Sequence, residues 1–239
     1  MRRFVRRVTD WLELLKLSLR WQLGRRAWIV PLLALAWPAY RALQLVAGWR
    51  PRRFEPEDAQ NALIGVPLTV LAIFLGVRII AAEIEQRTLE VTYTVPGGAS
   101  RVWVAKLCAA ALPLLAAAVL LGAITAVFFT PYSVGAFYGA VQGAIFFLAL
   151  SMGLGALLKS ELTASLVAMV ALVLTGLVSG FGEIPRRWSP FFNPLTVQSD
   201  AVDVVAWTIQ NRIGVALAVL ALVALTSVRT ERREQLLRI

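Results

Sequence analysis

The sequence predicts an all-α membrane protein that crosses a bilayer about six times, with an amphipathic helix before the first span. Three observations predict this fold class. Apolar residues make up 59% of the 239 residues, and the mean hydropathy is +0.71. These residues gather in blocks of about 20, the length at which a helix crosses the hydrocarbon core. Short polar, proline-bearing or charged stretches separate the blocks, which leaves little room for a separate soluble domain.

Residues 1–26 are expected to form a helix that lies in the membrane interface. Val8, Trp11, Leu15 and Leu19 recur at helical spacing, and charged side chains occupy the opposite face. A cleavable signal would instead follow its arginines with a short apolar core and a small-residue cleavage site. We therefore expect the first residues to stay with the protein as an interfacial helix.

The rest of the chain is interpreted as a single transmembrane domain. Residues 27–82 hold spans one and two, residues 83–101 form a charged connection, residues 102–228 hold spans three to six, and residues 229–239 form a charged tail. The six apolar blocks are, in order, residues 27–47, 62–82, 102–129, 135–158, 162–181 and 209–228. The polar stretch at 197–205 fits either an outer amphipathic helix or the tilted start of span six.

The distribution of lysine and arginine predicts that both termini are cytoplasmic. With the N-terminus inside, the inner segments hold sixteen basic residues and the outer loops hold six. Such an excess on the cytoplasmic side is typical of helical membrane proteins. We therefore expect a multi-pass protein of the plasma membrane, with the 83–101 connection on its inner side.

Composition also excludes several classes of function. The net charge is +10, but the basic residues flank the apolar blocks, so we expect no nucleic-acid partner. The chain has no histidine and a single cysteine, Cys108, so it cannot build a His/Cys zinc site or a histidine-assisted nucleophile. None of its three lysines follows a glycine, so a phosphate-binding loop is missing. We expect no catalytic residue, metal or cofactor in this chain.

The connection after span two is the most informative segment. Its sequence from Ala82 to Leu107 is AEIEQRTLEVTYTVPGGASRVWVAKL. Glu83, Arg87 and Glu90 are spaced so that one helical face carries alternating charge. A Pro-Gly-Gly turn then breaks the helix, and Ser100 is a plausible cap for the next one. The pattern predicts a short charged helix below the membrane that reverses into span three.

This segment resembles the membrane subunit of type-2 ABC exporters, the ABC-2 permease family. In that family, span two ends in a pattern like E-x-E-x-G-T-L-E, followed by a Thr-Pro turn, Ser-Arg and a lysine that opens span three. The matching residues here are Glu83, Glu85, Thr88, Leu89, Glu90, Pro96, Ser100, Arg101 and Lys106. Two positions depart from the pattern, because Arg87 stands where glycine is usual and the turn carries an extra glycine. The SPFFNP sequence at 189–194 and the N-terminal amphipathic helix are also similar to that family.

The resemblance implies a function and a set of partners. The N-terminal helix would be the family's elbow helix, and residues 83–101 would form the coupling helix and turn. The chain would pair with a second copy or a paralogue, and two cytoplasmic ATPase subunits would bind ATP and Mg²⁺ below it. The complex would export an amphiphilic or otherwise unidentified substrate. The residues that the resemblance assigns to ATPase coupling are Glu83, Glu85, Arg87, Thr88, Leu89 and Glu90.

Other functions fit the same layout. The charged connection could be a solvated loop that only fixes topology. The chain could be a channel or secondary transporter that needs no ATPase. It could also be a membrane scaffold or immunity-type protein that binds a partner without transporting anything. Association with an ATPase distinguishes the exporter from all three.

Two arginines fall within the expected spans. Arg41 could extend outward to the interface or face a central cavity and attract an anionic substrate. Arg78 could extend inward, pair with Glu85 or contribute to a substrate pathway. A ridge of small residues, Gly135, Gly139 and Gly143, predicts close helix packing, either within the subunit or at a dimer interface. Membrane lipid is the remaining expected partner.

Overall fold

A computed structural model describes residues 13, 16–18, 24, 28–49, 52–86, 99–197 and 200–231. The expected interfacial helix at residues 1–26 lies almost wholly outside the described residues, as does the end of the charged tail. Within the described part, the regular elements are helices and no strand is present. The all-α fold class is therefore confirmed.

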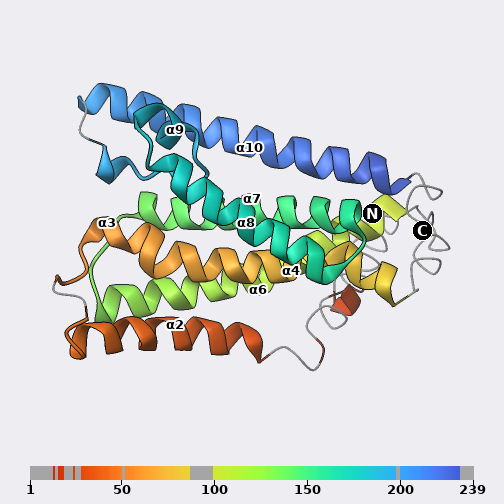
Figure 1. The fold of residues 1–239 in the computed structure, drawn as a ribbon, viewed down its shortest axis with the longest axis horizontal. Coiled ribbons are helices and arrows are strands. Elements are labelled where there is room, and N and C mark those ends of the chain that lie inside the picture. The colour runs from red at the N-terminus through yellow and green to blue at the C-terminus, as the bar shows by residue number, and fades with distance from the viewer. Residues whose placement is uncertain are drawn as a thin grey trace, which may run out of the picture.

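Among the described residues, six long helices run in alternating directions along the bundle (Figure 1). Each expected apolar block corresponds to one of them. The helices are α2 (Ile29–Val46), α4 (Val66–Glu85), α6 (Ala99–Phe128), α7 (Val134–Leu158), α8 (Glu161–Ser179) and α10 (Ala201–Glu231). Short elements connect them, namely α3 (Pro56–Asp58), η2 (Ala59–Gly65), α9 (Glu183–Trp188) and η3 (Pro194–Thr196).

Five helical stretches in the described part are long and apolar enough to cross a membrane. They are Pro56–Glu85, Val102–Phe128, Val134–Leu158, Glu161–Ser179 and Ala201–Thr230. The first expected span corresponds to α2, an 18-residue helix near the lower limit of length for crossing the hydrocarbon core. The structure therefore shows five candidate spans plus this shorter apolar helix, where the sequence predicts about six.

Helix α4 forms the centre of the bundle. It packs most extensively on α7 and also contacts α6, α8 and α2, and α10 lies along the other side of α7 (Figure 1). Most of its residues are buried because other helices surround it. The polar residues before the last block resolve into α10, so residues from Ala201 onward are the start of that long helix.

A π-helical segment, η2, leads into α4 and was not predicted. Pro67 has no N–H and its ring crowds the carbonyl of Leu63, which disfavours regular α-helical bonding at this point. The Val66 N–H bonds the Asn61 carbonyl, five residues back, so the Ala62 carbonyl is released from the helix. The indole Nε1 of Trp37 in α2 donates to that carbonyl at 2.9 Å. The irregular turn therefore joins α2 to α4.

Candidate functional site

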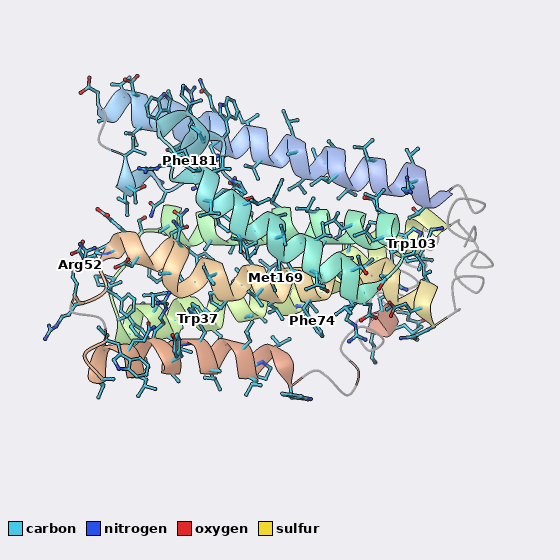
Figure 2. All side chains as sticks on the ribbon, in the orientation of Figure 1. Trp37, Arg52, Phe74, Trp103, Met169 and Phe181 are labelled. Carbon is cyan, nitrogen blue, oxygen red and sulfur yellow. The ribbon has the colours of Figure 1, made fainter. Side chains whose placement is uncertain are left out.

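The site begins where α4 ends and α6 starts, at the two ends of the charged connection. Glu83 in the last turn of α4 and Lys106 near the start of α6 form an ion pair. Each side chain is about 10% exposed. The Lys106 ammonium also lies 5.1 Å from the centre of the Trp103 ring, which is buried at the same end of the bundle (Figure 2).

The burial of this pair decides what it can do. Removing two charges from water is costly, and the cost is compensated only while the partners remain together. Separating α4 from α6 at this end would leave a buried charge without its partner. The pair therefore favours movement of the two helix ends as one unit.

Glu85, about half a helical turn after Glu83, connects α4 to a third helix. Its Oε1 accepts a hydrogen bond from the backbone N–H of Glu161 at 2.8 Å. Glu161 is the first residue of α8, and a carboxylate there satisfies a free N–H and complements the helix dipole. The carboxylates of Glu83 and Glu85 thus tie the end of α4 to α6 and to α8.

The rest of the predicted coupling motif, Arg87, Thr88, Leu89 and Glu90, lies outside the described residues. Within the described part, α4 ends at Glu85. The placement of Glu83 changes its expected role. The charged face formed by Glu83, Arg87 and Glu90 was predicted to belong to a short helix below the membrane, whereas the Glu83 side chain is buried between helices. Glu83 positions α6, and Glu85 is the more exposed of these two carboxylates.

Arg41 is held by its own neighbourhood in α2. Its Nη1 donates to Gln44 Oε1 at 2.9 Å, and its guanidinium lies 4.8 Å from the centre of the Trp37 ring. The Phe54 ring lies on another side, at 5.9 Å. These contacts fix the side chain on aromatic surface near the C-terminal end of α2. They assign it a packing role, and a substrate contact stays a prediction.

Arg78 lies within α4, about two turns before its end. Its guanidinium carbon is 5.5 Å from the centre of the Phe74 ring, and its Nε and Nη1 are buried without a hydrogen-bond partner among the described residues. The predicted pairing of Arg78 with Glu85 is not formed, since the Glu85 carboxylate bonds the α8 N-terminus instead.

The glycine ridge on α7 packs against residues of the same chain. A Cβ at Gly139 would lie 2.6 Å from the Gln60 side-chain amide, and one at Gly143 would lie 2.7 Å from the Phe191 ring. Gly135 approaches only Ser133, at 3.7 Å. Two of the three glycines therefore make room for η2 and for the loop after α9.

A buried polar network at the opposite end of the bundle was not predicted. Gln60 in η2 is fully buried, and its Nε2 donates to the Phe192 carbonyl at 2.8 Å. Asn211 in α10, also fully buried, donates through Nδ2 to the carbonyls of Arg187 and Ser189, both at 2.8 Å. These amides add hydrogen bonds to the loop carbonyls, of which the Ser189 carbonyl also accepts from the Phe192 N–H at 3.0 Å.

The network continues through Gln142 of α7 to Arg212 of α10. Gln142 donates to Asn211 Oδ1 at 3.3 Å and accepts from Arg212 Nη1 at 3.0 Å. Asn193 donates to the Glu57 carbonyl at 3.0 Å, so the loop is also tied to α3. The SPFFNP loop is thus anchored to three separate elements. The sequence signal for this network was limited to Gln142 and Asn211, which are polar residues inside apolar blocks, whereas Gln60 and Asn193 lie between the blocks.

Comparison with known proteins adds no relative. The sequence matches no family model, and neither a curated protein nor a solved structure matches it.

Proposed function

We propose that this chain is the permease subunit of an ATP-binding-cassette exporter. In this proposal α2 is the first of six spans, residues 1–26 form an interfacial elbow helix, and both termini are cytoplasmic. The chain pairs with a second copy or a paralogue in the plasma membrane. Separate ATPase subunits bind ATP and Mg²⁺ and supply the energy, because this chain carries no phosphate-binding loop.

The observation that carries the proposal is the connection between the motif and the helices around it. The motif resembles a family pattern in which residues 83–101 dock on the ATPase. The Glu83–Lys106 pair and the bond from Glu85 to α8 join three helices at the base of that segment. A segment that receives force from a partner needs such a base, whereas a loop that only fixes topology does not.

The proposed mechanism follows from these contacts. Closure of the ATPases would displace residues 83–101, and the buried ion pair would make α4 and α6 follow together. Since α4 is the centre of the bundle, its movement would be passed to α7 and α8 through their packing. Reorientation of the spans would then open the pathway outward for an amphiphilic or otherwise unidentified substrate, with Arg41 and Arg78 as candidate contacts.

Co-purification tests this proposal. A tagged full-length chain, extracted from its native membranes in mild detergent, is expected to bring down an ATPase subunit in a fixed ratio. Glu90→Lys reverses a charge in the proposed docking segment and is expected to reduce the ATPase recovered at least fivefold. The matched control is Glu57→Lys, because Glu57 is an exposed glutamate at the other end of the bundle.

The outcomes separate the exporter from the alternatives. A chain that purifies as a stable oligomer without an ATP-binding subunit would be a channel, secondary transporter or scaffold. Equal loss of the ATPase in Glu90→Lys and Glu57→Lys would show that residues 83–101 are not its docking site.

A further inference from the structure

A groove between α7 and α10 lies at the end of the bundle that carries the Glu83–Lys106 pair. Its volume is about 450 Å³. The two helices that form it lie side by side (Figure 1). The groove residues are Leu150, Gly153, Leu154, Leu157, Leu222, Leu225, Thr226, Val228 and Arg229. We propose that this groove binds one anionic phospholipid of the cytoplasmic leaflet, with the acyl chain between the helices and the phosphate on Arg229.

The walls of the groove suit a hydrocarbon chain. Apart from Thr226 and Arg229, its lining side chains are aliphatic, together with Gly153. The one hydroxyl, Thr226 Oγ1, already donates to the Leu222 carbonyl at 2.7 Å, so it presents little polarity. Gly153 deepens the floor, because a Cβ there would lie 3.1 Å from that hydroxyl oxygen. An apolar chain can therefore occupy the groove without leaving a buried polar group unsatisfied.

Arg229 supplies the charge at one end of the groove. It lies in the last turn of α10, and its Nε is buried without a hydrogen-bond partner among the residues that the structure describes. A guanidinium is always charged, and its planar edge can donate two parallel hydrogen bonds to a phosphate. The unsatisfied Nε is thus matched by a phosphodiester oxygen.

The depth of Arg229 selects a lipid of the inner leaflet. The distribution of lysine and arginine places the end of α10 at the cytoplasmic surface, and Arg232, Arg233 and Arg238 follow in the sequence. Basic pockets between transmembrane helices on this side are typical binding sites for anionic headgroups. Another groove of similar size, at the C-terminal end of α8, differs because Arg186 there already donates to the carbonyls of Ser179 and Thr196.

Native mass spectrometry of the full-length chain tests the site. The chain is exchanged into detergent with equal amounts of phosphatidylglycerol and phosphatidylcholine of identical acyl chains. We expect one phosphatidylglycerol to be retained about fivefold over phosphatidylcholine, because both lipids offer a phosphodiester to Arg229 but only phosphatidylglycerol keeps a net negative charge beside it. Arg229→Gln should remove this preference, and Arg229→Lys should keep part of it, because the charge remains but the planar edge is lost.

Two further variants locate the lipid. Arg53→Gln removes an exposed arginine outside the groove and should leave the preference unchanged. Leu225→Trp fills the groove and should lower retention of both lipids. Unchanged phosphatidylglycerol in Arg229→Gln, or equal retention of both lipids by the original chain, would overturn the proposal. Displacement of the bound lipid by millimolar inorganic phosphate alone would also overturn it, since the site would then select a free anion.

Discussion

The buried ion pair between Glu83 and Lys106 makes a quantitative prediction. Glu83→Gln and Lys106→Met each keep the approximate volume of the side chain but remove its charge. Because both side chains are about 10% exposed, each single substitution leaves an uncompensated buried charge. Losing one partner of a buried pair typically costs about 3–5 kcal/mol, whereas replacing both partners is close to neutral. The double variant should therefore be more stable than either single variant.

Unfolding in mixed micelles of a mild detergent and sodium dodecyl sulfate, followed by circular dichroism, measures these differences as a double-mutant cycle. We expect a coupling free energy of about 3 kcal/mol between the two positions. Glu57→Gln serves as the control, because this exposed glutamate at the other end should change stability by less than about 0.5 kcal/mol. Additive single effects, or single effects near zero, would show that Glu83 and Lys106 do not act as a pair.

Three further predictions concern the rest of the bundle. Gly139→Ala should destabilise the chain by about 1–3 kcal/mol in the same unfolding assay, because the new methyl group would lie 2.6 Å from the Gln60 amide. Gly135→Ala should be neutral or slightly stabilising, because its methyl group would approach only Ser133, at 3.7 Å. Asn211→Ala should cost about 1–3 kcal/mol by removing the two hydrogen bonds to the Arg187 and Ser189 carbonyls, and faster proteolysis of the 189–194 loop should accompany it. Glu85→Gln should cost at most about 1 kcal/mol, since this exposed carboxylate acts on a helix N-terminus, and a larger loss would mean that it is buried on assembly.

Much of the fold was predictable because the dominant signal is length. An apolar block of about 20 residues has few alternatives to a helix when no water is present to satisfy its backbone. The apolar block from Gly135 to Leu158 agrees with α7 to within one residue. The polar residues before the last block were ambiguous, because Asp200 and Asp203 are compatible with either a separate helix or the first turn of α10.

The irregular start of α4 could not be predicted from periodicity. Pro67 alone indicates a break in the helical hydrogen bonds. The π-helical turn, however, also depends on Trp37 from α2, whose indole N–H donates to the Ala62 carbonyl. The polar network shows the same limit. Gln60, Gln142 and Asn211 lie far apart in the sequence, and only the packing of η2, α7 and α10 brings them to one loop.

The sequence predicted where the candidate site lies, at the connection after span two, but not which residues contact one another there. The spacing of Glu83, Arg87 and Glu90 indicates one charged face on a short helix below the membrane, and this prediction did not include the burial of Glu83 beside α6. Glu83 is buried because α6 packs beside α4 and places Lys106 opposite Glu83. A pairing over 23 residues cannot be derived from helical spacing within one segment.

A structure of the chain purified from its native membranes with its bound partners most directly tests whether it is an ATP-driven permease. The proposal predicts two permease subunits above a pair of ATPases, with residues 83–101 seated in a cleft of each ATPase and the Glu83–Lys106 pair intact behind them. A particle in which residues 83–101 contact only solvent or lipid, with no ATP-binding subunit present, would show that the chain does not work as such a permease.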